Sequence, residues 1–190
     1  MSKVFILPVT ILFFFFAVSC HRASDYQKRV KSELATGQRN DTLFLGIYFG
    51  MKQDSFFKHC TMLNHQERIR EGVSNLSVQF ELKGKNALRN PASMNFFPDF
   101  EGHKIVQMPI NFSYANWAPW NPSTSPDSLL VDVLGLMDKW YGKGFIKEGN
   151  PEKGWVYVKV DGNRQIIISK NDELKVVGMM TDLSVKPPKF

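Results

Sequence analysis

The side chains in this sequence best suited to bind a metal ion or act as nucleophiles are two cysteines and four histidines. His59 and Cys60 are adjacent, and neighbouring positions on a helix point about 100° apart, so they cannot share one ion. His59 and His65 are six residues apart, whereas zinc-binding helices place two histidines four apart. His21 and His103 lie in segments with loop character. We therefore expect no metal site and no cofactor.

Motifs for hydrolysis are also missing from the sequence. It contains no Gly-x-Ser-x-Gly stretch and no glycine-rich phosphate loop. Asp99 and Glu101 flank Phe100 in a segment rich in turn residues, where carboxylates are ordinarily solvated. The sequence thus predicts no catalytic residue. A site assembled from residues far apart in the chain remains open as the alternative.

Charge gives little support for nucleic acid as a partner. The chain has 24 Lys and Arg against 18 Asp and Glu, a formal charge of +6. These charges are interspersed along the chain, and no run of basic residues resembles a nucleic-acid patch. Nucleic acid is therefore not an expected partner.

The first nineteen residues have the pattern of a secretory signal. Lys3 is followed by an uncharged run over 4–18, rich in phenylalanine. A membrane-spanning helix needs about 20 apolar residues, so this run is short for a permanent anchor. A positive start, an apolar centre and a small-residue end are typical of a signal peptide. We assign residues 1–19 to it.

Cys20 follows this run directly. The stretch Ala-Val-Ser-Cys at 17–20 resembles the bacterial lipobox. The resemblance implies that Cys20 becomes the acylated N-terminus of an exported lipoprotein, with the lipid bilayer as its partner. Ordinary cleavage before Cys20, without acylation, is the alternative. His21 in place of aspartate favours the outer membrane by the same resemblance, and leaves the periplasmic or surface face undecided.

The remaining chain divides by composition into three parts. Residues 20–41 are polar and predict a flexible tether. Residues 42–185 carry the apolar periodicity of one domain, and 186–190 form a loose tail. Only Cys60 remains if Cys20 is acylated, so no disulfide within the chain is expected.

The expected fold class is α+β, with two helices packed on an antiparallel β-sheet. Apolar periodicity predicts strands over 41–51, 75–84 and 105–117, helices over 53–64 and 126–141, and a hairpin plus a third strand over 154–185. Pro109 places its strand at an edge, and Asp161-Gly162 is the expected hairpin turn. Each helix opens on Asp-Ser and precedes strands. This order is compatible with two α-then-β halves over 42–118 and 126–185, or with coincidence.

Gly50, Met51 and Phe57 resemble the start of the first helix in small barrel-assembly-type lipoproteins of the outer membrane. The order of elements is similar to the β-lactamase-inhibitor-like tandem α+β fold. The resemblance implies a non-catalytic protein that presents a sheet face or loops to another protein.

One surface segment is predicted to bind. Trp117 and Trp120 stand among prolines, with Asn116 and Asn121 beside them and Tyr114 just before. Exposed tryptophans in loops form sugar-stacking platforms or protein contacts. Both rings folding back as a small core is the alternative. We therefore expect an envelope lipoprotein that binds an envelope protein or a surface polysaccharide. The second hypothesis is an envelope hydrolase acting on glycan or lipid.

Overall fold

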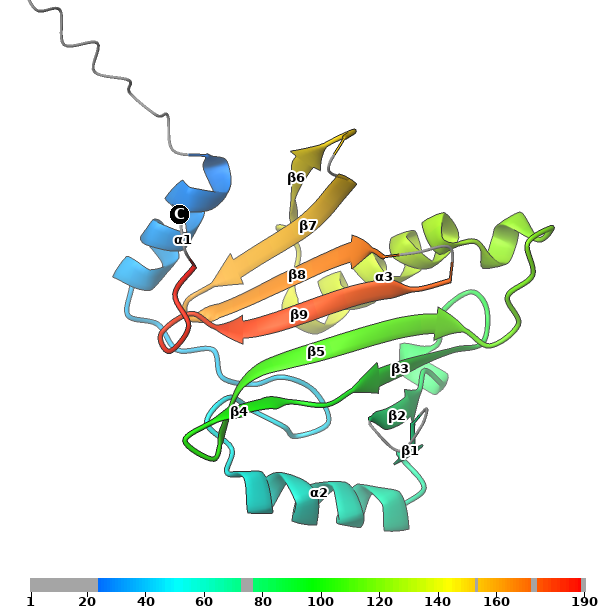
Figure 1. The fold of residues 1–190 in the computed structure, drawn as a ribbon, viewed down its shortest axis with the longest axis horizontal. Helices are drawn as coiled ribbons and strands as arrows, with labels where there is room; N and C mark the ends of the chain where they lie inside the picture. Colours follow the sequence, from blue (N-terminus) through cyan, green and yellow to red (C-terminus); the bar gives the residue numbers. More distant parts are fainter. Residues whose placement is uncertain (1–23, 73–76, 153, 172–173, 189–190) are drawn as a thin grey trace, which may run out of the picture.

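An antiparallel β-sheet organises the chain in the computed structural model, which describes residues 24–72, 77–152, 154–171 and 174–188 (Figure 1). The predicted signal peptide and Cys20 lie outside the described residues. The described part contains three α-helices and a sheet of nine strands, so the α+β class is confirmed. Within the described residues, no helix is both long enough and apolar enough to cross a bilayer.

The strands run in the order β1-β2-β3-β5-β9-β8-β7-β6, and β4 pairs with β5 outside this path. Their bounds are β1 Arg70–Glu71, β2 Val78–Glu81, β3 Ala92–Phe96, β4 Asp99–Glu101, β5 Lys104–Tyr114, β6 Ile146–Asn150, β7 Gly154–Asp161, β8 Arg164–Lys170 and β9 Val176–Asp182. The strands β1 to β5 and the strands β6 to β9 meet where β5 pairs with β9 in the middle of the sheet. The edges of the main path are therefore β1 and β6.

Both predicted helices are present. They are α2, Gln53–His65, and α3, Pro126–Tyr141. The limits of α3 follow from its terminal residues: the Ser125 hydroxyl accepts a hydrogen bond from the Ser128 N–H, and Pro126 occupies the first turn. At the other end Gly142 adopts φ +80°, a backbone conformation that residues other than glycine rarely adopt.

One face of the sheet carries the main core. Register brings Met94, Phe112 and Val176 side by side across three strands, each with 0% of its surface exposed. Val133 and Met137 of α3 cover this face and are equally buried. At Gly178 a Cβ would lie 2.6 Å from Ile110 Cγ1, so the centre of the sheet has no room for a side chain there. Residues 42–51 pack into the same core.

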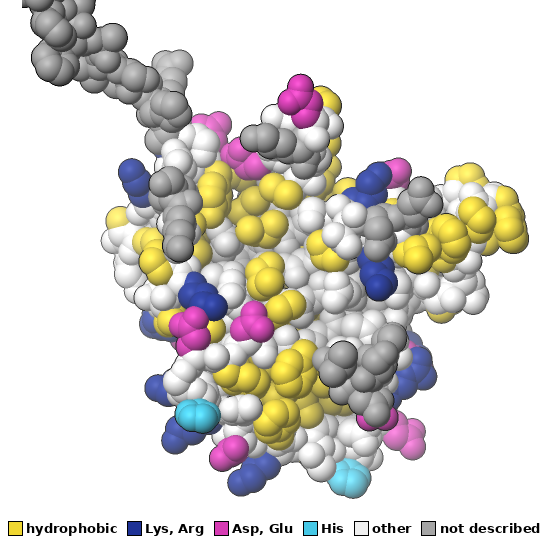
Figure 2. Space-filling model, viewed as in Figure 1, with side chains coloured by type: hydrophobic (Ala, Val, Ile, Leu, Met, Phe, Trp, Pro, Cys, Tyr) yellow, Lys and Arg dark blue, Asp and Glu magenta, His cyan; other side chains and the backbone are white. Residues whose placement is uncertain are grey.

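The other face is covered at one end by a helix that the sequence did not predict. α1, Asp25–Ala35, lies where we expected a flexible tether, and that prediction is wrong. Its Val30 is 1% exposed and packs against Val158, Val160 and Leu183. Figure 2 views this face, where hydrophobic side chains remain visible in the middle of the sheet.

A polar network holds the chain that follows α1. Asp182, only 2% exposed, accepts hydrogen bonds from Asn163 Nδ2 at 3.0 Å and from Arg39 at 3.1 Å. Arg39 also pairs with Asp41 at 2.7 Å. Glu33 of α1 accepts the Gly162 N–H at 2.9 Å. The N-terminal segment is thus fixed to the β7–β8 turn and to the last residue of β9.

Several local predictions need correction. Residues 41–51 form turns and an isolated Thr42–Tyr48 bridge instead of a strand, because they bend over the core face. Pro109 lies in the interior strand β5. On the side of β5 that faces β3 and β4, β4 pairs only as far as Gln107 and β3 begins pairing at Ile110. Pro109 therefore has no paired residue on that side, and its missing N–H is tolerated.

Other connections also differ. Residues 86–104, whose prolines and glycine predict an irregular connection or a broken hairpin, contain β3 and β4, and β6 was not predicted. Asp161 pairs with Arg164, so the two-residue turn is Gly162-Asn163, one residue later than expected. Lys186 is not loose, because it bonds Gln107 Oε1 at 3.0 Å and pairs with Glu101 at 2.8 Å. The sequence also predicts a second turn at Asn171-Asp172, and its second residue lies outside the described residues.

Candidate functional site

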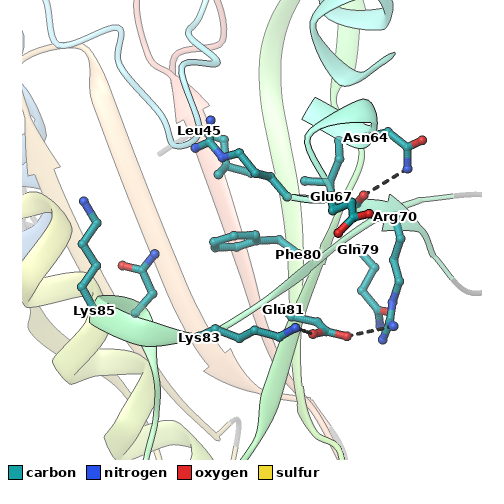
Figure 3. A pocket seen from close by; sticks show the side chains of 12 residues that line it. Leu45, Asn64, Glu67, Arg70, Gln79, Phe80, Glu81, Lys83 and Lys85 are labelled. Atoms are coloured by element: carbon teal, nitrogen blue, oxygen red, sulfur yellow. Dashed lines mark hydrogen bonds and ion pairs between the residues drawn. The ribbon is translucent and has the colours of Figure 1, made fainter. Parts of the chain in front are cut away.

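A groove lies along the outer side of β2, between the end of α2, residues 42–46 and the end of α3. It consists of two adjoining hollows of about 570 and 480 Å³, which share Leu45, Arg68, Phe80, Lys85 and Asn86. We call these two hollows the basic groove. Figure 3 shows the larger one, with the Phe80 ring between Leu45 and Lys83.

The floor of the basic groove is apolar. Phe80 and Leu45 are half-buried there and pack against the main core, and Ile69 is 5% exposed. Trp140 closes the second hollow and donates its indole N–H to Asn86 Oδ1 at 3.1 Å. This bond holds the ring against Asn86 at the wall of the second hollow.

The rim is mainly basic. Arg68, Arg70, Lys83, Lys85 and Lys139 stand against two carboxylates, Glu67 and Glu81. Glu81 is already paired with Arg70, at 2.8 Å, and with Lys83. The hydrogen bond from Lys83, together with both positive charges, lowers the pKa of Glu81.

Two cations of the rim have no such partner. Among the ion pairs and hydrogen bonds of the described residues, none involves the side chain of Arg68 or Lys85, and both side chains are exposed. Lys139 donates to the Lys85 carbonyl oxygen, which holds its ammonium beside this part of the rim. The rim therefore offers uncompensated positive charge above an apolar floor.

The backbone of β2 adds hydrogen-bonding groups. β1 pairs only with Val78 and Gln79, so β2 continues beyond its outer neighbour. The Leu82 N–H donates to the Ala92 carbonyl at 2.9 Å, which points Leu82 toward β3. Because hydrogen-bonded and non-hydrogen-bonded pairs alternate in an antiparallel ladder, the N–H and C=O of Glu81 point the other way, toward the groove. An unpaired strand edge of this kind is a template for another strand.

The groups around the groove are those of a binding surface. In the described part of the chain, no three His, Cys, Asp or Glu residues converge as metal ligands would. The groove combines an apolar floor, cationic side chains and an open strand edge. A ligand with carboxylate or other anionic groups beside apolar ones would satisfy all three.

The residues of the predicted tryptophan loop differ in exposure and in hydrogen bonding. Trp120 is 83% exposed and Trp117 37%, so the alternative of a small core is wrong for Trp120. Asn116 is also exposed. Asn121 is occupied instead, because its Oδ1 accepts the N–H of Ser123 at 3.1 Å and caps a short 3-10 helix, Pro122–Thr124.

Tyr114 does not belong to this surface. It is 6% exposed, and its hydroxyl donates to Asp132 at 2.8 Å. Burial first, and then the hydrogen bond to this carboxylate, raise the Tyr114 pKa to about 12. Including Tyr114 among the binding residues was wrong, because the side chain lies on the core face of β5.

The remaining candidate residues make contacts within the fold. His59 Nε2 lies 2.8 Å from the Leu45 carbonyl oxygen. Cys60 is half-buried, and burial raises its pKa to about 11, which keeps the thiol protonated and weakly nucleophilic. Asp99 and Glu101 occupy β4, with Glu101 paired to Lys186.

The basic groove was missed at the sequence level. Its lining comes from segments around residues 45, 68, 80, 85 and 139, which only the fold brings together. The four cations over 68–85 stand in two separated pairs, which gave no signal in the sequence alone. Comparisons of the chain with protein-family models, with curated proteins and with solved structures find no match.

Proposed function

We propose that this chain is an envelope lipoprotein, anchored through Cys20, that binds a protein partner without catalysis at the basic groove. The anchor is supported by the signal-like run over 1–19 and the lipobox resemblance at 17–20. His21 after the cysteine supports the outer membrane as its location. The binding role is supported by the groove.

The partner chemistry that fits the groove is an extended acidic segment of a protein. The observation that carries this choice is the outward-facing backbone of Glu81 beside Arg68 and Lys85. A peptide strand can continue the ladder there, as in β-strand addition. Alternate side chains of such a strand would reach the Phe80 floor and the basic rim.

The position of the groove suits an anchored binding protein. The groove borders β1 and β2, at one edge of the sheet, while α1 packs on β7 near the other edge. If Cys20 holds the α1 end at a bilayer, the groove lies at the far edge of the sheet, open to a partner.

We also infer that the domain is a tandem of two α-then-β halves. α2 precedes β1, β2, β3 and β5, and α3 precedes β6, β7, β8 and β9. The last strands of the two halves, β5 and β9, pair in the middle of the sheet. The Trp120 loop joins the halves and is exposed enough to form a second contact.

A labelled peptide of alternating acidic and apolar residues, Glu-Val-Asp-Val-Glu-Val, tests the groove. We expect it to bind with an affinity that weakens as salt rises, because the rim charges are exposed. The double variant Arg68→Glu, Lys85→Glu should weaken binding at least tenfold. Lys31→Glu, an exposed charge on α1, is the matched control and should have no effect.

Equal binding by the charge-reversed groove and the control would overturn the proposal. An acidic polysaccharide that binds the groove where the peptide does not would also overturn it, since it would replace the protein partner by a glycan. Mass spectrometry of the N-terminal peptide separately tests the anchor, and an unmodified Cys20 would remove that part of the proposal.

A further inference from the structure

The first described helix begins very close to the proposed anchor. Ser24 caps α1 with a reciprocal pair of bonds: its hydroxyl accepts the Gln27 N–H at 3.1 Å, and its own N–H donates to Gln27 Oε1 at 3.0 Å. Four peptide units separate Ser24 from Cys20 in the sequence. Their full extension spans at most about 14 Å. A lipid attached to Cys20 therefore cannot be far from the start of α1.

α1 cannot swing freely to move that end away. The Val30 side chain is 1% exposed against β7, and Glu33 bonds the Gly162 N–H. The Tyr26 hydroxyl accepts a hydrogen bond from Gln165. The helix is thus fixed to the sheet along its length. An anchor at Cys20 would therefore orient the whole domain relative to the bilayer.

The hairpin of β6 and β7 lies at the same end of the molecule. The Tyr26 N–H in the first turn of α1 donates to Glu148 Oε1 of β6 at 3.2 Å. Figure 1 shows the hairpin projecting beyond the rest of the sheet, on the side where α1 begins. A bilayer that receives the anchor therefore lies beside this hairpin.

The hairpin carries side chains suited to a bilayer interface. Trp155, at the start of β7, is 42% exposed, and the Lys147 ammonium lies 4.1 Å from the centre of its ring. Tryptophan is enriched at headgroup level, because its ring is apolar while its N–H can bond. A lysine beside it can extend its ammonium toward the headgroups. Glu148 and Glu152 belong to the same segment, so its charge is mixed and not strongly basic.

We propose that the β6–β7 hairpin, through Trp155 and Lys147, contacts the phospholipid bilayer at headgroup level and sets the orientation of the anchored domain. The proposal rests on the proposed anchor at Cys20. It places the β6 edge of the sheet against the membrane and the basic groove at the opposite edge, away from it. The bilayer contact is made by a side chain of the folded domain and needs no membrane-spanning helix.

Tryptophan quenching by brominated phosphatidylcholine tests this orientation. The acylated chain, produced in cells that modify lipoproteins, is reconstituted in vesicles with and without the brominated lipid. We expect a quenchable part of the fluorescence that falls by at least half in Trp155→Phe. Trp120→Phe is the matched control, because Trp120 is more exposed than Trp155 but belongs to the connection between β5 and α3, and the quenchable part should be retained.

The outcomes separate the contact from the anchor. An acylated chain whose quenching is unchanged by Trp155→Phe, or is lost with Trp120→Phe, overturns the hairpin contact and leaves the anchor intact. A chain in which mass spectrometry finds no acyl group on Cys20 overturns the anchor, and the orientation proposal falls with it. Circular dichroism of both variants checks that each retains the fold.

Discussion

The two faces of the sheet are closed in different ways. On one face α3 and residues 42–51 cover a continuous apolar core that includes Phe112, Val133 and Met137. On the other, α1 covers only the β7–β8 end, through a small cluster centred on Val30. A network of Arg39, Asp41, Asn163 and Asp182 supplements that cluster. The first face is held by burial and the second largely by specific polar contacts.

This difference separates stability from attachment. Apolar burial contributes roughly in proportion to area, so the α3 face should dominate the free energy of unfolding. The α1 face buries little, and its hydrogen bonds each contribute only about 1 kcal/mol net. Changes on the α3 face should therefore unfold the domain, while changes on the α1 face should release the N-terminal segment first.

The largest effect is expected on the α3 face. Met137→Asp places a charge where the side chain is 0% exposed, inside the main apolar core. We expect a loss of at least about 3 kcal/mol in the free energy of unfolding. Urea denaturation measures it. Val131→Asp, on the exposed side of the same helix at 64%, is the control and should change little. Similar losses in both variants would contradict the assigned orientation of α3.

A smaller effect is expected where the N-terminal segment meets the hairpin of β7 and β8. Gly162 has φ +57°, and a Cβ there would lie 2.3 Å from the Gln38 carbonyl oxygen. Gly162→Ala should cost about 1–3 kcal/mol and release the segment before global unfolding. Hydrogen exchange of α1 amides would show this as early loss of protection.

Gly135→Ala provides the opposite control. Gly135 lies in α3 with nothing within 4 Å of an added Cβ, so alanine should stabilise the helix by about 0.5–1 kcal/mol. If Gly162→Ala behaved in the same way, the close approach of Gln38 would have no energetic role.

The polar network predicts acid sensitivity at the α1 face. Burial acts to raise the Asp182 pKa, but hydrogen bonds from Ser184 and Asn163 and the charge of Arg39 outweigh it, and the pKa is lowered from 3.8. A carboxylate with a lowered folded-state pKa adds stability above its unfolded value, and this is lost as the pH falls through the folded value. Protection of α1 should therefore decrease below about pH 4.

Asp182→Asn tests this assignment directly. Asparagine cannot ionise, so the acid-dependent part of the hydrogen-exchange protection of α1 should shrink. Protection at neutral pH should already be lower than in the unchanged protein. An unchanged pH dependence in hydrogen exchange would show that another group controls the attachment.

The smallest effect is expected at the tryptophan loop. Trp120 is 83% exposed, so Trp120→Ala should change the free energy of unfolding by no more than about 0.5 kcal/mol. Trp140→Ala is the comparison, because Trp140 is half-buried and bonded to Asn86, and it should cost clearly more. Thermal melts of the two variants suffice. A large loss in Trp120→Ala would place that ring in contacts that the fold does not show.

The elements that sequence predicted correctly are those whose evidence is local. α3 has a serine cap, a proline in its first turn, an apolar stripe and a terminal glycine, all within residues 125–142. α2 has the same periodicity. The strands of the 154–182 meander alternate clearly between turns. Each of these signals is contained in the element itself.

The elements that were missed depend on distant partners. α1 has one local signal, the Ser24–Gln27 cap, but it contains few apolar residues, and Val30 gains its partners from β7 and Leu183, far along the chain. Residues 41–51 alternate like a strand but are used as core-covering turns. Pro109 was assigned to an edge because the change of partner from β4 to β3 cannot be inferred from β5 alone. The basic groove was invisible for the same reason, since its lining comes from several separate segments.

The docking of α1 also has a consequence for the order in which the molecule is made. The helix is synthesised first, yet its partners Gly162 and Gln165 lie 129 and 139 residues downstream of the groups they bond. Closing so long a loop is slow compared with forming the helix itself. If the chain is exported as we propose, α1 emerges early and stays undocked until β7 and β8 have followed it across the membrane. Acylation at Cys20 would then take place on a chain whose first helix is still free, before the domain acquires its fixed orientation.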